Sequence, residues 1–225
     1  LSKYFTRNLL SWFIQIDILV GLIGGFSSSA LFILFEFAGS FQLLLYGLVM
    51  LTGILVGLEI PLIMRILKDE FDFTDLVSKV FTFDYIGALL ASLVFPLVLV
   101  PYLGLVKTSF LFGILNVSVA IALCIKLSYM GQWFSVLRRI GFASLLILLL
   151  GFVMSERIVA FSESISYAEP IIFAKSSPYQ RIILTRNKKE LRLYLNGNLQ
   201  FSSADEYRYH EALVHPIMQQ VKNSC

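Results

Sequence analysis

The stretch that decides the fold is YIGALLASLVFPLVLVPYLGLV, residues 85–106, which contains no charged side chain. Asp84 precedes it and Lys107 follows it. Because a helix rises about 1.5 Å per residue, about 20 apolar residues are needed to cross about 30 Å of hydrocarbon. The stretch is long enough for this, and it therefore predicts a transmembrane helix.

Similar apolar segments lie on both sides of this stretch. They cover residues 18–35, 37–58 (extending to 64 if the helix includes Glu59), 108–125 and 140–155. The last is the shortest, and it spans a bilayer only if Glu156 and Arg157 extend their charged ends to the interface. A soluble all-α protein is excluded, because its buried helices rarely run this long without a polar face. The fold class that we predict is therefore an α-helical polytopic membrane bundle of about five transmembrane helices, in a domain of residues 1–160.

Composition supports the same class. The chain is 57% hydrophobic and 15% charged, with a net charge of +3. Soluble domains have about 45–50% apolar and about 25% charged residues. The basic residues are scattered or sit at segment ends, unlike the basic stripe of a nucleic-acid-binding protein. Cys124 and Cys225 form no metal or disulfide pattern. We expect the lipid bilayer to be a partner, no nucleic acid and no metal.

Residues 161–225 have a different pattern. Residues 180–185 contain β-branched residues typical of a short strand, residues 190–195 alternate polar and apolar as a half-buried strand does, and residues 199–201 form a third short strand, with turns at 187–189 and 196–198. Ser202 or Ser203 can then cap a helix that starts near Ala204 and ends at Pro216. The second domain, residues 161–225, is thus predicted to be a small β-hairpin region followed by one short helix.

Three motifs in this tail carry a resemblance to a known family. They are SPYQRI (177–182), LYLNGNLQ (193–200) and DEYRYHEALVHP (205–216). Together they resemble the amino-terminal β-hairpin region of spermidine synthases, the polyamine aminopropyltransferases. In the helical part, GLEIPL (57–62) and DYIGALL (84–90) resemble the membrane-bound branch of that family.

The resemblance implies a reaction and a set of binding residues. Members transfer the aminopropyl group of decarboxylated S-adenosylmethionine, a co-substrate rather than a cofactor, to putrescine, giving spermidine and methylthioadenosine. By position, Gln180 matches the glutamine that contacts the adenosyl donor. Tyr209 and His210 match the pair near the amine substrate and the donor. No catalytic residue is assigned in this chain.

The family's donor-binding domain begins beyond the matched helix, with a strand and a Gly-Gly-Gly-Asp-Gly loop that residues 1–225 lack. We therefore expect a fragment without the catalytic domain, inactive alone. Two alternatives stay open: a membrane transporter and a pseudoenzyme remnant without catalysis. Glu59, inside an apolar run, is the feature that favours transport, since it could contact a cation. Asp17, Glu36 and Asp84 are placed at segment ends and given no role. Assembly into a homo-oligomer stays open.

The expected location is a bacterial inner (cell) membrane, with multiple passes. The sidedness is contradictory. Basic residues concentrate on the side that holds the amino end, which places that end in the cytoplasm and the tail outside. The family's donor is made in the cytoplasm, which implies a cytoplasmic tail. Gly21 with Gly25, and Gly53 with Gly57, form small-xxx-small patterns that allow helices to approach closely.

Overall fold

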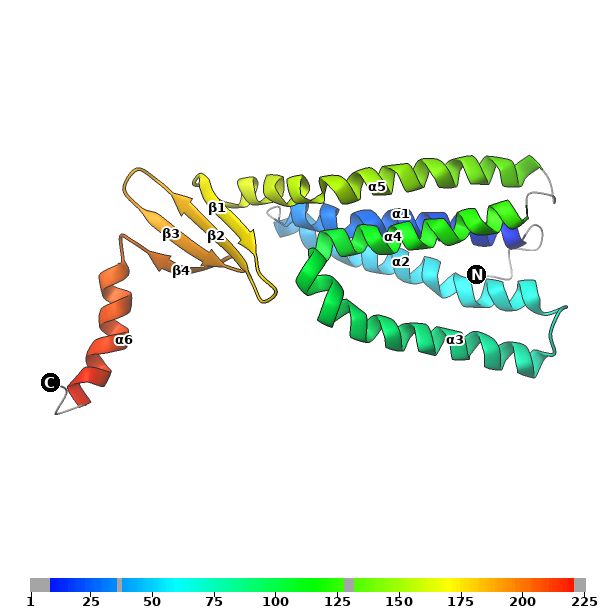
Figure 1. Cartoon of the computed structure of the whole chain (residues 1–225), viewed down its shortest axis with the longest axis horizontal. Coiled ribbons are helices and arrows are strands. Elements are labelled where there is room, and N and C mark those ends of the chain that lie inside the picture. Colours follow the sequence, from blue (N-terminus) through cyan, green and yellow to red (C-terminus); the bar gives the residue numbers. More distant parts are fainter. Residues whose placement is uncertain (1–8, 36–37, 128–131, 221–225) are drawn as a thin grey trace. The chain divides into compact units, whose positions relative to one another are not determined.

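The computed structural model describes residues 9–35, 38–127 and 132–220. The chain divides into two compact units, residues 1–162 and residues 163–225. The first unit is built from long helices and the second contains a small sheet and a short helix (Figure 1). A mainly helical protein with a small antiparallel sheet and a short carboxy-terminal helix was predicted, and this coarse architecture is confirmed.

The five helices described in unit 1 are α1 (Leu9–Leu34), α2 (Ala38–Leu67), α3 (Phe73–Val94), α4 (Val100–Lys126) and α5 (Gln132–Ser166). Four of these five helices are longer than the charge-free segments of the sequence, and α3 is shifted relative to its segment. The segment predicted to be shortest, 140–155, belongs to the longest of these helices, with 35 residues. The helix extends beyond the apolar segment because charged residues such as Arg138 and Glu156 do not end a helix; their backbone groups continue the i→i−4 bonds. Asp17 and Asp84 likewise lie inside α1 and α3, whereas Glu36 is outside the described residues.

The chain reverses direction between α3 and α4 earlier than predicted (Figure 1). We expected the break at Lys107, but a π-helical turn, Phe95–Leu99, follows α3, and Gly104 has a positive φ of 78°. Pro96 lacks a backbone N–H, and glycine accepts a positive φ without a steric penalty, so both residues favour a break here. Lys107 is instead a residue of α4.

Helix α1 packs most closely on α4. A Cβ atom added to Gly21 would lie 2.7 Å from a methyl carbon of Val117 and 2.9 Å from the carbonyl oxygen of Gly113. Added to Gly25, it would lie 2.5 Å from Leu148 of α5. The predicted close approach at Gly21 and Gly25 is therefore confirmed. At Gly53 and Gly57 of α2, an added Cβ would meet nothing within 4 Å among the described residues, so that pattern marks no contact there.

The second unit contains a four-stranded antiparallel sheet in the order β1-β2-β3-β4. Its strands are β1 (Ile171–Ser176), β2 (Arg181–Arg186), β3 (Leu191–Leu195) and β4 (Asn198–Ser202). The three predicted strands correspond to β2, β3 and β4, but β1 was missed. Its pattern gives little alternation, since five of its six residues are exposed. Asn196 (φ 50°) and Gly197 (φ 80°) form the predicted tight turn between β3 and β4.

Helix α6 spans Glu206–Gln220, which differs from the prediction at both ends. Ser202 and Ser203 do not cap it. The Ser202 hydroxyl donates to Glu190, and the Ser203 hydroxyl accepts the backbone N–H of Leu191, so both serve the sheet. The helix also continues through Pro216, where we had expected it to end. A proline costs a helix one hydrogen bond and strains it, but this helix continues for one more turn.

Candidate functional site

Gln180 was predicted to open a strand, and the structure places it just before β2, in the turn after β1. Ser177 fixes this turn. Its hydroxyl accepts the backbone N–H of Gln180 at 3.0 Å and donates to the Gln180 carbonyl oxygen at 2.9 Å, which is also bonded by the Ser177 N–H at 2.9 Å. The Gln180 side chain is half-buried, and its amide makes no hydrogen bond to the described residues. The backbone is thus held while the amide stays available to a ligand.

The next residue, Arg181, fastens the start of β2. Its guanidinium donates two hydrogen bonds to the carboxylate of Glu163, both 2.7 Å long, and a third of 3.0 Å to the Ser176 hydroxyl. Its backbone N–H donates to the side-chain oxygen of Asn196 at 2.8 Å. A two-bond arginine–carboxylate pair fixes orientation as well as distance. The Ser177–Gln180 turn therefore leads directly into a rigidly held strand.

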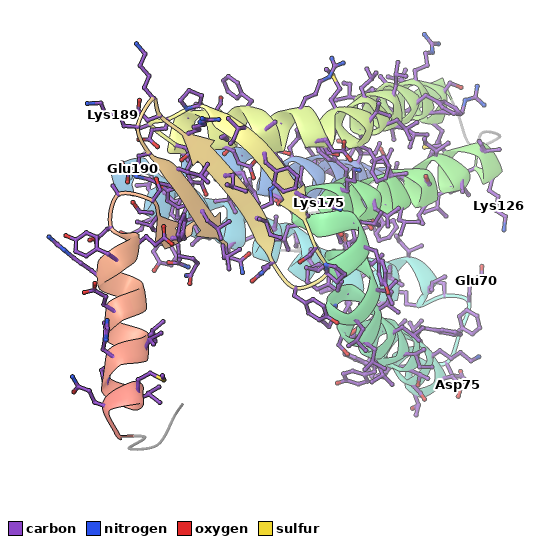
Figure 2. The ribbon with its side chains drawn as sticks, turned by 60° about the vertical axis from the view of Figure 1, so that its left-hand side comes forward. Glu70, Asp75, Lys126, Lys175, Lys189 and Glu190 are labelled. Carbon is purple, nitrogen blue, oxygen red and sulfur yellow. The ribbon has the colours of Figure 1, made fainter. Side chains whose placement is uncertain are left out.

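A polar network crosses the sheet next to this region. Arg192 donates two bonds of 2.8 Å to Glu190 and lies 3.4 Å from Glu169. Ser202 donates to Glu190 at 2.5 Å, and Thr185 donates to Glu169 at 3.2 Å. Figure 2 places Glu190 at the start of β3, beside the turn that ends at Lys189. The network joins β2, β3 and β4 through their side chains.

The charged groups of this network shift one another's pKa values. The hydrogen bonds from Arg192 and then from Ser202 lower the pKa of the Glu190 carboxyl below its ordinary value of 4.5. In return, the hydrogen bond to Glu190, followed by one to Tyr194, raises the pKa of Arg192. Both groups are therefore charged at neutral pH. Sequence reasoning missed this network, and the charged residues of strand 190–195 were its only signal.

Tyr209 and His210 lie on α6, one turn from its start, as the backbone shows. Their side chains are outside the described residues, so their grouping with Gln180 stays a prediction. The neighbouring described side chains of α6, 206–208 and 211–219, are all exposed.

Two carboxyl groups of the helical unit lie together, and the sequence pointed to only one of them. Asp17 of α1 is only 6% exposed, although we had given it no role. It lies close enough to Glu59 of α2 for their charges to interact. One oxygen of each group, Oδ2 and Oε1, is buried without a hydrogen-bond partner among the described residues. The missed signal was that Asp17 is the only charged residue of Leu9–Leu34.

Glu59 also lines a groove between α2 and α3. The groove has a volume of about 440 Å³ and is mainly apolar. Its lining residues are Glu59, Ile60, Ile63, Leu67, Phe71, Leu76, Lys79, Val80, Phe83 and Asp84. At the end near the α2–α3 loop, where Figure 2 shows Glu70 and Asp75, the ammonium of Lys79 lies 4.6 Å from the ring centre of Phe71.

Comparison with known proteins gives a consistent result over nearly the whole chain. A "Polyamine aminopropyltransferase" of Leptospira interrogans is 51% identical over 218 residues, which are 97% of this chain and 44% of that protein. "Polyamine aminopropyltransferase 2" of Ralstonia nicotianae is 50% identical over 236 residues, 99% of this chain and 45% of that protein. A relative of the same name in Oceanobacillus iheyensis is 39% identical over 226 residues, 99% of this chain and 44% of that protein.

The chain spans a little under half the length of these relatives. No family model matches the chain, and no solved structure matches it. The matched region covers both units, since the similarity extends over 97–99% of the 225 residues. The chain therefore belongs to the polyamine aminopropyltransferase family.

Proposed function

We propose that this chain is the membrane-embedded and hairpin part of an aminopropyltransferase that moves an aminopropyl group from decarboxylated S-adenosylmethionine to putrescine. The observation that carries the proposal is the 51% identity to the Leptospira relative over 97% of the chain. Because the chain spans 44% of that relative, the full reaction is proposed for the complete protein. We expect residues 1–225 alone to form no product, since they contain no glycine-rich loop after a strand.

Membrane insertion is proposed on the length and surface of the helices. Four helical stretches are long and apolar enough to cross a membrane, namely 9–34, 41–67, 73–126 and 133–166. The third, with 54 residues, contains the reversal at Gly104 and so supplies two passes. Large apolar side chains on α2 and on the π-helical turn Phe95–Leu99, such as Leu43 (79% exposed) and Leu97 (68%), point outward. A surface of this kind is stable against lipid and not in water.

The second unit is proposed to contribute substrate-binding residues. The free amide of Gln180 is suited to hydrogen bonds with the polar adenosyl group of the donor. Tyr209 can present an aromatic face to a cationic amine or to the donor sulfonium. His210 can accept or donate a hydrogen bond in the same region. The fixed Ser177 turn and the Arg181–Glu163 pair keep Gln180 in place.

A chimera tests this function. The 218 matched residues of the Leptospira interrogans protein are replaced by those of this chain, and methylthioadenosine is measured with putrescine and the decarboxylated donor. We expect activity within about tenfold of the unaltered relative. In the chimera, Gln180→Ala is expected to raise the donor KM by about tenfold, the loss of one hydrogen bond to a charged or polar ligand.

Gln219→Ala serves as the matched control, because Gln219 is an exposed residue of α6. It removes the same amide and should leave the donor KM unchanged. A chimera that folds, inserts in membranes and forms no methylthioadenosine would contradict the proposed function. Equal KM values for the Gln180 and Gln219 variants would remove Gln180 from the donor site.

A further inference from the structure

Packing does not explain the carboxyl pair of the helical unit, in which Asp17 is buried and Glu59 is half-buried. Phe13 and Ile16 of α1 form a buried cluster with Leu62 of α2, and Leu58 packs against it. Asp17 and Glu59 are the chain neighbours of Ile16 and Leu58, so the two carboxyls sit at the edge of this apolar contact. Burying a carboxyl without a partner is costly, and two adjacent carboxylates also repel each other.

One oxygen of each carboxyl is buried without the donor that usually satisfies such an atom. Asp17 Oδ2 and Glu59 Oε1 have no hydrogen-bond partner in the part of the chain that the structure describes. The oxygens are therefore placed to accept from a group that carries several donors and a positive charge.

The groove between α2 and α3 defines the shape of that group. Glu59 belongs to both features, since it interacts with Asp17 and lines the groove. The side chains that follow from Glu59 toward the α2–α3 loop are apolar, among them Ile63, Leu76 and Val80. Lys79, also in the lining, lies over Phe71 and 3.9 Å from Asp75, so its ammonium is engaged away from the pair. A methylene chain fits such a wall.

We propose that Asp17 and Glu59 bind the ammonium group of a primary alkylamine, whose methylene chain lies in the groove between α2 and α3. An ammonium has three donors and one positive charge, which together match two orphan carboxyl oxygens and their repulsion. The site lies in the helical unit, apart from Gln180 and α6 in the sequence. It does not depend on the proposed enzymatic reaction, because binding is measured without turnover.

Equilibrium binding to the purified chain in lipid nanodiscs tests the site. Radiolabelled putrescine is the probe, at neutral and mildly alkaline pH. We expect one saturable site per chain, with butylamine competing and tetramethylammonium, which has no N–H donor, failing to compete. Asp17→Asn and Glu59→Gln should each weaken binding by about tenfold or more, because each removes one of the two carboxylates that face the ammonium. Glu70→Gln, an exposed loop residue, should leave the affinity unchanged.

A variant in the groove tests the proposal even if a carboxyl variant does not fold. Val80→Trp retains both carboxyls and fills the apolar wall. It should weaken butylamine binding and leave methylammonium binding unchanged. A parallel titration with radiolabelled sodium separates an amine site from a metal-ion site. Sodium binding without amine binding, equal affinity in the Asp17 and Glu70 variants, or no bound cation at all would each overturn the proposal.

Discussion

Gly113 of α4 has no Cβ, and this allows the backbones of α1 and α4 to approach closely. A Cβ added to this residue would collide with the backbone carbonyl of Gly21 and lie 3.1 Å from the Cα of Gly25. Both neighbours are backbone atoms, which do not move aside as a side chain does. We expect Gly113→Ala to destabilise the helical unit by about 1–3 kcal/mol.

Thermal unfolding in detergent measures this effect. The control is Gly24→Ala, because an added Cβ at Gly24 meets nothing within 4 Å. Its stability should stay within about 0.5 kcal/mol of the unmodified chain. Equal melting temperatures for the two variants would show that α1 and α4 do not pack through their backbones.

Glu190 gives the sheet a dependence on pH. Since its pKa is lower in the folded sheet than the ordinary 4.5, its stabilising contribution is complete above about pH 4.5 and is lost as the pH falls through the folded value. We expect the β3–β4 region to lose amide protection on acidification. In Glu190→Gln this loss should be smaller, because the group no longer titrates.

Amide hydrogen exchange of β3 and β4, corrected for the intrinsic rate, measures this difference. Glu211→Gln on α6, an exposed residue, is the control and should keep the full acid response. The same acid response in the Glu190 variant as in the unmodified chain would rule out the contribution of the Arg192 network.

At the scale of elements, the turn at Asn196–Gly197 determines how β3 and β4 pair. Gly197 has a φ of 80°, a region that residues with a Cβ enter at a cost of about 1 kcal/mol. We expect Gly197→Ala to increase amide exchange in β3 and β4 by about fivefold, the equivalent of that cost. Lys188→Ala in the preceding turn, an exposed residue, should leave exchange unchanged. Unchanged exchange in both variants would show that the turn does not limit this pairing.

Local sequence signals predicted some elements well and others poorly. The Asn196-Gly197 pair identified its turn, because few residues adopt a positive φ. The run of 85–106 identified a long apolar helix but not its end, since Pro96 and Gly104 were hidden within a charge-free stretch. Charges misplaced the other boundaries. Helix α5 includes Arg138 and Glu156, and nothing in the pattern distinguishes a flanking charge from an internal one.

At the scale of the whole molecule, the sidedness of the tail links the two units to the proposed reaction. In the described part of unit 1, α1 to α5 alternate in direction, so the start of α1 and the end of unit 1 lie at opposite ends of the bundle (Figure 1). The proposed donor is cytoplasmic, and the proposed function therefore requires a cytoplasmic tail. We expect a membrane-impermeant thiol reagent to label Cys225 only after the cells are opened.

Cys124 does not interfere, because it is buried and 1% exposed. A Cys225→Ser variant is the control and should remain unlabelled under both conditions. Labelling of Cys225 in intact cells would contradict the proposed function and would agree with the distribution of basic residues.

The candidate site divides in the same way between local and tertiary information. Linear motifs identified Gln180, Tyr209 and His210, and their binding roles stay predictions. Glu59 was identified as unusual because it interrupts an apolar run. Asp17 was dismissed as a flanking charge, since only the packing of α1 on α2 reveals that it is buried beside Glu59. Pairs formed across helices are invisible to a pattern read along the chain.

The reversal between α3 and α4 has a consequence for biosynthesis. Residues 95–104 carry no charge, and the connection is a π-helical turn, Phe95–Leu99, followed by the start of α4 with Pro101 and Gly104, rather than a polar loop. If the chain inserts in a membrane as proposed, α3 and α4 reach the bilayer with no hydrophilic stretch at their connection, 95–104, that could be held on the far side. In that case α3 and α4 would insert together as one helical hairpin. A charged residue placed at Gly104 would make the two helices insert one after the other.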